Sequence, residues 1–401
     1  MIEIIKDTKI DFMRAGRPLM GLSLLLLLGS VGVLLVRGLN LGIEFTGGTE
    51  LQIKYAARPD VGAIRAALEA GGLTSQVVTT IGDPSENEVY IRLGAVPGAG
   101  DEDLTTRVAR TLRDADGGSG RLDLNVADAA SIARLLAGIP DVGAEPATAL
   151  AQAIVAERRE AAIFAGFDEL QAIPGFTPEI GEFLRDTAEF GPFAVRSQSY
   201  VGPAVGRELV RKAAWAILLS LVVMLLYIWV RYQLQWGFAA VLAVAHDALI
   251  TLAAFSLLWK EMSLPVVAAF LTLIGYSVND TVVIFDRIRE NLRNRVGGSL
   301  EETVNLSINQ TLSRTIITSG LTWMSCLGLY LFGGPALNAF AFVLTFGIVI
   351  GSYSTICIAS PFLVMWKRFL DRRARTTATA AAAPGGRPAR KLRNPSSRRA
   401  G

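Results

Sequence analysis

The chain alternates long apolar runs with one long stretch of mixed polarity. Six runs approach the roughly 20 residues that a helix needs to cross a bilayer. They are Pro18–Val36, Ala213–Val230, Phe238–Leu258, Leu264–Phe285, Thr315–Phe332 and Phe340–Met365. Buried helices of soluble proteins rarely combine this length with this uniformity. The pattern therefore predicts a polytopic α-helical membrane protein with six transmembrane helices, the first at 18–36 and the others within 213–365.

The mixed stretch, residues 37–212, contains strand and helix patterns in a recognisable order. After Gly47-Gly48, polar and apolar residues alternate as in a strand; apolar residues then recur at helical spacing, two β-branched segments follow, and a second helical pattern closes the series. These segments are Thr49–Tyr55, Pro59–Ala70, Gln76–Ile81, Glu88–Leu93 and Asp101–Asp114. A last strand, Phe193–Val201, leads back to the apolar runs. The order predicts a ferredoxin-like α+β domain built from residues 42–116 and 192–201.

The intervening segment 117–191 predicts an inserted helical module. Two helix–turn–helix patterns share an Ile-Pro turn, at Ile139-Pro140 and Ile173-Pro174, and they are similar to helix-hairpin-helix units. Such units bind DNA when basic residues flank the turns, whereas acidic residues surround the turns here. They are Asp141, Glu145, Asp168, Glu169 and Glu179. Backbone phosphates would be repelled, so we expect no specific nucleic acid partner but a structural or protein-contacting module.

The distribution of Lys and Arg predicts the orientation in the membrane. Basic residues cluster in the lead-in 1–17, after the second run, in the loop after the fourth run and in the tail 366–401. The opposite short loops hold only Lys260. By the positive-inside rule both termini are cytoplasmic and the segment 37–212 is extracytoplasmic. We expect an amphipathic lead-in, a first run retained as an anchor because Arg37 follows it directly, and a disordered basic tail attracted to anionic membrane lipid.

Composition excludes most enzymatic chemistry. The chain has one histidine, and its two cysteines, Cys326 and Cys357, lie inside apolar runs, so neither a metal cluster nor a disulfide is expected. No Gly-rich phosphate motif such as GxxxxGK[ST] is present. We therefore expect no catalytic residues, no cofactor and no metal, and the energy for any transport must come from a partner or an ion gradient.

Two charges lie where charge is costly. Asp280 is inside the fourth apolar run and Arg314 opens the fifth, so both reach a similar depth. A charge at the centre of a membrane helix costs roughly 2.5–3.5 kcal/mol on insertion scales, and less near its end. An aspartate that alternates between a proton-bound and an arginine-paired state would be a proton relay. A static ion pair, or an Arg314 that reaches to lipid phosphate, fits these residues equally well.

A third acidic residue, Asp247, lies in the middle of the third run beside His246. Carboxylates at the midplane usually face a bundle interior or a water path, which favours an ion-coupling role. Asp286 and Arg287 come at the membrane edge and are interpreted as a cytoplasmic cap. Gly347 and Gly351 form a small-xxx-small pair, typical of close helix packing.

Six motifs, in order, resemble the SecF family of protein-export membrane subunits, within the resistance-nodulation-division superfamily. They are GIEFTGGTELQI (from Gly42), VGPAVGRELVRKA (from Val201), AHDALIT (from Ala245), GYSVNDTVVIFDRIREN (from Gly275), NQTLSRTIITS (from Asn309) and LYLFGGPAL (from Leu329). The resemblance covers about residues 1–100 and 190–370, and leaves out the inserted module.

The resemblance implies a six-helix half that pairs with SecD and uses the proton-motive force to help preproteins leave the SecYEG channel of the cytoplasmic (inner) membrane; YajC is a further partner of such assemblies. It maps relay charges onto Asp280 and Arg314 and an acidic family position onto Asp247. Two alternatives remain open. One is an exporter of small molecules or lipids from the same superfamily, and the other is a passive scaffold for the channel.

Overall fold

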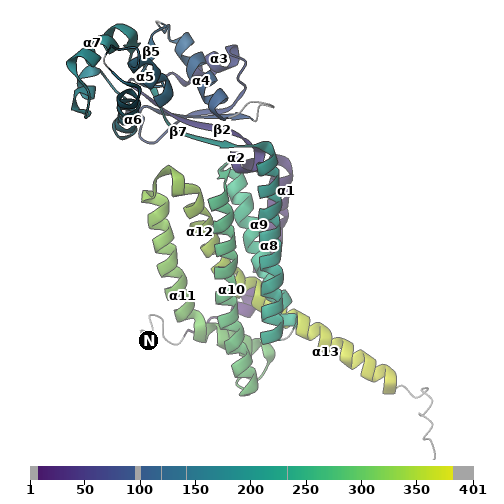
Figure 1. Ribbon diagram of the computed structural model, residues 1–401. Helices are drawn as coiled ribbons and strands as arrows, with labels where there is room; N and C mark the ends of the chain where they lie inside the picture. The colour runs from purple at the N-terminus through teal and green to yellow at the C-terminus, as the bar shows by residue number, and fades with distance from the viewer. Residues whose placement is uncertain (1–7, 95–100, 119, 141, 233, 383–401) are drawn as a thin grey trace, which may run out of the picture.

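A computed structural model describes residues 8–94, 101–118, 120–140, 142–232 and 234–382, and it divides into a helical bundle and an outer domain (Figure 1). The bundle helices are α1 (Phe12–Arg37), α8 (Pro203–Arg231), α9 (Leu234–Leu257), α10 (Leu264–Arg293), α11 (Leu300–Phe332), and α12 (Gly334–Ser354), which continues through the π-helical turn η3 (Thr355–Ala359) into α13 (Ser360–Ala382). Within these ranges six helical spans are long and apolar enough to cross a membrane, as predicted.

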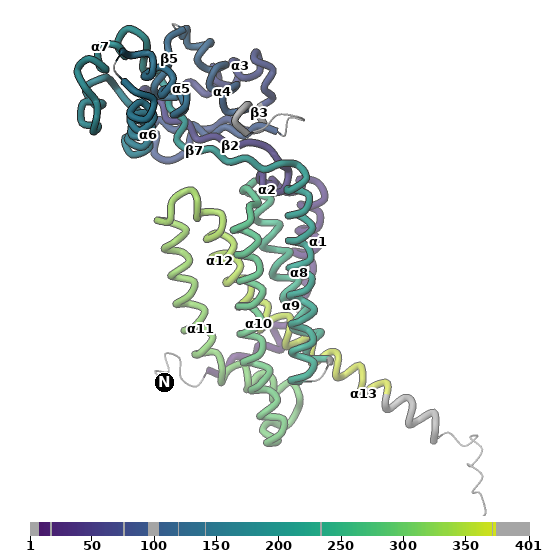
Figure 2. The backbone as a smooth tube through the Cα atoms, viewed as in Figure 1, coloured from purple at the N-terminus to yellow at the C-terminus, as the bar shows by residue number. Residues whose placement is uncertain are grey.

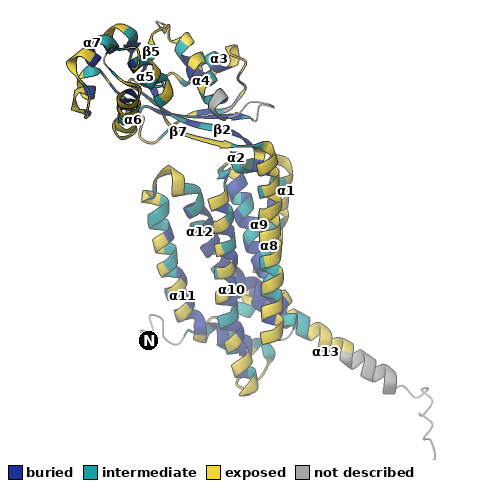
Figure 3. Cartoon of the chain, in the orientation of Figure 1, coloured by how far each residue is buried: buried dark blue, intermediate teal, exposed yellow. Residues whose placement is uncertain are grey.

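Three helices form the centre of the bundle and three flank it. In α9, α10 and the α12 span, half or slightly more of the most apolar window is buried, against 6–17% in α1, α8 and α11 (Figure 3). Gly347 on α12 allows the closest approach, because a Cβ there would lie 2.3 Å from Leu273 Cδ2 on α10. The expected close packing at this glycine is therefore confirmed.

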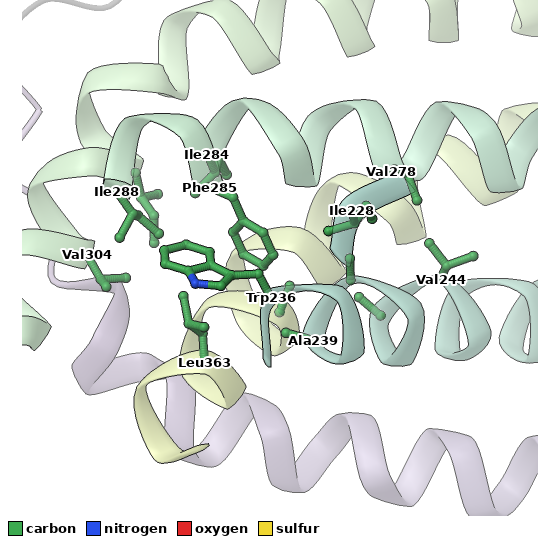
Figure 4. Packing of buried hydrophobic residues seen from close by; sticks show 14 of the residues in the cluster. Ile228, Trp236, Ala239, Val244, Val278, Ile284, Phe285, Ile288, Val304 and Leu363 are labelled. Carbon is green, nitrogen blue, oxygen red and sulfur yellow. The ribbon is translucent and has the colours of Figure 1, made fainter. Parts of the chain in front are cut away.

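The end of the bundle near α13 is closed by an apolar cluster around Trp236 (Figure 4). The indole ring of Trp236 packs edge-on against Phe285, with 5.1 Å between the ring centroids. Ile288, Val304 and Leu363 come to the same cluster from α10, α11 and α13. This packing fixes one end of the bundle around the turn between α8 and α9.

The outer domain contains a four-stranded sheet. Its strands are β2 (Gly48–Tyr55), β3 (Ser75–Ile81), β4 (Glu88–Gly94) and β7 (Phe193–Val201). The strand order is β3-β4-β2-β7, and all neighbours are antiparallel. Helices α3 (Val61–Ala70) and α4 (Asp101–Ala115) cover one face and share an apolar core with it. The predicted strand Phe193–Val201 is thus present and completes the sheet after the insertion, at its edge.

A helical module lies between α4 and β7 in the sequence and beside β7 in space (Figure 2). It consists of β5 (Leu122–Asp123), α5 (Ala129–Leu136), α6 (Ala144–Ala161), the 3-10 helix η2 (Phe167–Ala172), α7 (Pro178–Thr187) and β6 (Ala188–Glu189). It has its own apolar core, which includes Ile132, Ile154 and Leu184. The second predicted helix–turn–helix unit differs from the first, because its leading segment forms only the short 3-10 helix η2.

The two parts meet at a joint built from short elements. These are β1 (Asn40–Leu41), α2 (Ile43–Thr46) and β8 (Glu261–Met262), with β1 and β8 paired in parallel. Gly47 and Gly48 have φ of +73° and +138°, and a Cβ on Gly47 would lie 2.9 Å from Pro203 Cα at the start of α8. The glycine pair therefore lets the chain turn from α2 into β2 directly against α8.

Two helices extend beyond their apolar runs. The helix that contains the fifth run begins at Leu300, so Arg314 lies well inside α11. The tail is not irregular from residue 366, because α13 continues to Ala382; residues 383–401, and residues 1–7 of the lead-in, lie outside the described residues.

Candidate ion-coupling site in the helical bundle

Asp247 is the most enclosed acidic side chain of the bundle. It lies on α9 with 1% of its surface exposed, where α10 and α12 meet α9. Its Oδ2 accepts hydrogen bonds from Ser277 Oγ of α10 at 2.6 Å and from Ser354 Oγ of α12 at 2.7 Å. Its Oδ1 lies 3.0 Å from Nδ1 of His246. The carboxylate thus joins three central helices through the two serine hydroxyl groups, and the imidazole comes from its own helix.

A second polar contact lies close to Asp247. Thr281 Oγ1 of α10 and Thr355 Oγ1 of η3 are 3.1 Å apart, and both residues are fully buried. Single π-helical turns inside longer helices often occur at functional sites. Here the turn begins directly after Ser354, so it helps to set the position of a hydroxyl that binds Asp247.

Asp280 is the second buried carboxylate, on the same helix as Ser277. Its exposed fraction is 4%, and its Oδ2 accepts a hydrogen bond from Ser319 Oγ of α11 at 2.8 Å. Residues three apart on a helix are neighbours on its surface. Ser277 and Asp280 therefore form one polar stripe on α10, which reaches Asp247 on one side and α11 on the other.

Arg314 does not pair with Asp280. It lies on α11, five residues before Ser319, which corresponds to roughly 7–8 Å along the helix axis. No ion pair or hydrogen bond of its guanidinium occurs among the described residues, and the side chain is exposed on the flank of the bundle. The sequence placed these two charges at a similar depth, and in the described residues no direct ion pair joins them.

We call Asp247, Asp280 and the serine hydroxyl groups bound to them the polar layer of the bundle. Asp286 and Arg287 lie outside this polar layer, at the end of α10 near α13. Asp286 Oδ1 is 3.7 Å from Nη2 of Arg231 at the end of α8. Arg287 Nε donates to Gln310 Oε1 of α11 at 2.7 Å, and its Nη1 donates to Glu290 Oε2 at 2.7 Å. Both residues thus tie α10 to neighbouring helices at the bundle edge.

Sequence reasoning missed the three serines that bind the carboxylates, Ser277, Ser319 and Ser354. Small hydroxyl residues inside apolar runs are also common as simple packing residues, so they carry no signal alone. Their position relative to the acidic residues could have been found: Ser277 precedes Asp280 by one helical turn. In the part of the chain that the structure describes, no group of three or more His, Cys, Asp or Glu side chains could hold a metal ion.

Comparisons with known proteins agree with this architecture. The family described as protein export membrane protein SecD/SecF, C-terminal, matches residues 182–369, and the SecD/SecF GG motif matches residues 32–57. The protein translocase subunit SecF of Koribacter versatilis is 38% identical over 96% of this chain and 98% of its own length. The chain belongs to the SecF family. The SecF of Desulfurispirillum indicum is 35% identical over 90% of this chain and 93% of its own length.

The solved structures most useful for comparison are of SecDF, a translocon-associated membrane protein. SecDF of Thermus thermophilus matches with a TM-score of 0.63 and 30% identity over 90% of this chain. A SecDF structure in a super-membrane-facing form gives a TM-score of 0.55 at 31% identity over 94% of this chain. The chain covers only 39% and 41% of these two SecDF chains. Membership of the SecF family makes the chain an accessory subunit of the Sec protein translocase and a multi-pass membrane protein.

Proposed function

We propose that the chain is the SecF half of a SecD–SecF pair that uses the proton-motive force to promote export of preproteins through SecYEG. The observation that carries this proposal is the polar layer of the bundle. Two carboxylates, Asp247 and Asp280, are almost fully buried, and hydroxyl groups rather than cations are their main partners. Ionised groups are costly at this depth, whereas a carboxyl group that takes up a proton there becomes neutral and less costly.

Arg314 supports the part of the proposal that concerns SecD. An arginine stays charged at all relevant pH values, so at membrane depth it needs an acceptor. The exposed position of Arg314 on α11 leaves room for an acidic residue from a second subunit. SecD would supply this residue and cover the flank of the bundle that the chain leaves open. Asp280 would then exchange its proton next to a subunit interface.

The proposed orientation follows the basic residues. The chain crosses the cytoplasmic (inner) membrane with both termini in the cytoplasm, and the sheet domain and helical module lie outside, where preproteins emerge. Asp286 and Arg287 then close the cytoplasmic end as a cap between α8, α10 and α11. YajC is a further partner in this assembly, and anionic lipid contacts the basic end of α13.

The proposal is tested by neutralising the two charges of the layer. Asp280→Asn and Arg314→Ala should assemble with SecD but lose the stimulation of export by a proton gradient, because each removes one of the charges that the relay needs. Export into membrane vesicles is measured with and without the gradient.

Glu208→Gln and Lys212→Ala serve as matched controls, because these residues form an exposed ion pair on α8, 2.9 Å apart. Both controls should keep full stimulation. If Asp280→Asn and Arg314→Ala also export at the original rate under a gradient, the relay is wrong and a passive scaffold role remains.

A further inference from the structure

A cleft of about 920 Å³ separates the sheet domain from the helical module. Its walls are α4 on the sheet-domain side and α5 and α6 on the module side, and β7 contributes the four consecutive residues Val195–Gln198. Figure 1 shows the helical module, with α5, α6 and α7, at the far end of β7 from the bundle. The cleft is distinct from the polar layer of the bundle, and none of the residues discussed there lines it.

The strand that contributes to this cleft has a free edge. Within the described residues β7 is hydrogen-bonded to β2 alone, and residues 196–200 are exposed. The outward N–H and C=O groups of such a strand can pair with another extended chain. Peptide recognition by strand addition uses this arrangement: the backbone gives affinity and the neighbouring side chains give specificity.

Two buried polar atoms of the lining residues lack hydrogen-bond partners within the described residues. Asp123 is 2% exposed, and its Oδ1 accepts from the N–H groups of Asn125 and Gly191, each at 2.9 Å, whereas its Oδ2 has no partner. Thr105 Oγ1 on the α4 wall is also buried without a partner. Both atoms are closed off from solvent, and Asp123 Oδ2 lies against Gly191, where a Cβ would come within 2.0 Å of it. The groups that an occupant of the cleft can reach are therefore the exposed edge of β7 and the charged side chains of the walls.

Arginines outnumber aspartates in the lining of the cleft, and two of the arginines form neither an ion pair nor a hydrogen bond within the described residues. Five arginines and three aspartates line it among the described residues. Arg113 pairs with Glu189, Arg196 pairs with Glu88, and Arg158 donates to the carbonyl groups of Leu124 and Ala127. The remaining two, Arg110 on α4 and Arg159 on α6, are exposed and form no ion pair or hydrogen bond among the described residues. One free guanidinium group thus lies on each wall.

We infer that this cleft binds an extended, acid-bearing segment of the polypeptide in transit, which adds to the edge of β7. A polypeptide in extended form presents both N–H and C=O groups to the strand and, at acidic residues, carboxylates to Arg110 and Arg159. The walls are charged and polar, whereas permanent subunit interfaces are more hydrophobic. A transient occupant therefore fits better than a strand of SecD. This inference rests on the proposed function, because that function supplies the unfolded polypeptide.

The test uses a photo-activated crosslinking residue at Gln198 in the full chain, assembled with SecD in membrane vesicles. A preprotein whose exit is blocked by a folded C-terminal domain holds one segment, rich in Glu and Asp, at the outer surface. Gln198 should capture that segment, whereas the same crosslinker at Thr79, exposed on the opposite edge strand β3, should not.

Charge reversal tests the specificity of the cleft. Arg110→Glu combined with Arg159→Glu should lower the yield at Gln198 roughly threefold to tenfold, as expected for the loss of two exposed ion pairs. The same change at Arg107, on α4 but outside the cleft, should leave the yield unchanged. When Lys replaces the acidic residues of the preprotein segment, the charge-reversed variant should give the higher yield at Gln198 and the original chain the lower one.

Three outcomes would overturn the inference: equal capture at Thr79 and Gln198, capture of SecD or of a second copy of this chain at Gln198, or a yield that ignores the charge reversal. The capture needs no proton gradient. Its failure is therefore separate from failure of the proposed relay, which the Asp280→Asn variant reports.

Discussion

At the scale of single residues, Asp247 shows how the bundle keeps a carboxylate at depth without a fixed cation. Two hydroxyl donors converge on one oxygen, and a histidine lies against the other. Hydrogen bonds to a charged group contribute roughly 1.5–3 kcal/mol each, more than bonds between neutral groups. The serines therefore matter for the stability of the central helices as well as for the site.

We predict that Ser277→Ala combined with Ser354→Ala lowers the stability of the bundle by about 2–5 kcal/mol, because a buried carboxylate oxygen then loses both of its donors. Thermal unfolding in detergent measures the effect. Ser325→Ala is the matched control, since its hydroxyl donates only to Leu321 O of its own helix at 3.1 Å. Adding Asp247→Ala to the double variant should recover part of the loss. No recovery would mean that the serines act only through packing.

The acidic residues of this site could be predicted from the sequence because a charge in an apolar run is conspicuous. The serines that donate hydrogen bonds to these acidic residues could not be predicted in the same way. A serine in such a run looks the same whether it faces lipid, another helix or a carboxylate, and only the rotation of each helix decides among these. The exposure of Arg314 was also beyond the sequence, because the polar residues that precede it hide the length of α11.

At the scale of elements, α11 illustrates why apolar runs underestimate helices. Asn305 and Asn309 lie in the polar segment before the apolar run, and both contact the chain around the start of α1: Asn309 Nδ2 donates to Ile10 O at 2.9 Å, and Asn305 Oδ1 accepts from the N–H of Met13 at 3.0 Å. The helix itself starts at a local capping box, in which the Ser299 hydroxyl accepts from the N–H of Glu302 and the Glu302 carboxylate accepts from the N–H of Ser299. The strands, in contrast, followed from local alternation and turn residues, and each predicted strand is present.

The β1–β8 joint contains a titratable contact. Arg92 of β4 is buried and donates to Glu261 Oε1 of β8 at 3.0 Å and to Asn40 Oδ1 of β1 at 3.0 Å. Burial, followed by the nearby carboxylates of Glu50 and Glu44, raises the pKa of Glu261 from its ordinary value of 4.5 to about 7, although Arg92 acts in the opposite direction. The docked joint therefore holds a proton that an opened joint would release.

We predict that docking of the sheet domain on the bundle weakens as the pH rises from about 5 to about 7. The direction of this pH dependence follows from proton linkage. The docked state binds the proton of Glu261 more tightly than the open state, so removal of protons at higher pH favours the open state. The measurement uses spin labels at Thr79 and Leu257, after replacement of the two native cysteines. The distribution of distances between the two labels should broaden over this pH range. Glu261→Gln should remove the pH dependence, and a dependence that survives this change would show that another group controls docking.

At the scale of the whole molecule, the chain has separate apolar cores for the bundle, the sheet domain and the helical module. The module leaves and re-enters the sheet domain through the parallel pair β5–β6, where Leu122 lies opposite Ala188. Its two ends are therefore adjacent, and a long insertion closed in this way costs little loop entropy.

Replacement of residues 117–191 by a short Gly/Ser linker should thus leave the sheet and the six spans folded, and binding to SecD should persist. Proton-driven export should fall, because one wall of the β7 cleft and the free guanidinium of Arg159 are then absent. Co-purification with SecD and export assays measure the two effects. Full export by the shortened chain would contradict a role for the module, and loss of SecD binding would show that it supports the subunit interface.

The glycine pair at the joint has a consequence for the freedom of the outer domain. The two chain crossings between bundle and sheet domain touch backbone to backbone there, since a Cβ on Gly206 of α8 would lie 3.0 Å from Gly47 N and from Phe45 O. Two crossings in contact at one point leave the outer domain no freedom to slide. It can only rotate about that pivot, and the contacts of Arg92 with β1 and β8 fix the angle. Loss of the Arg92 contacts would thus leave the outer domain freer to rotate about this pivot while its position stays fixed.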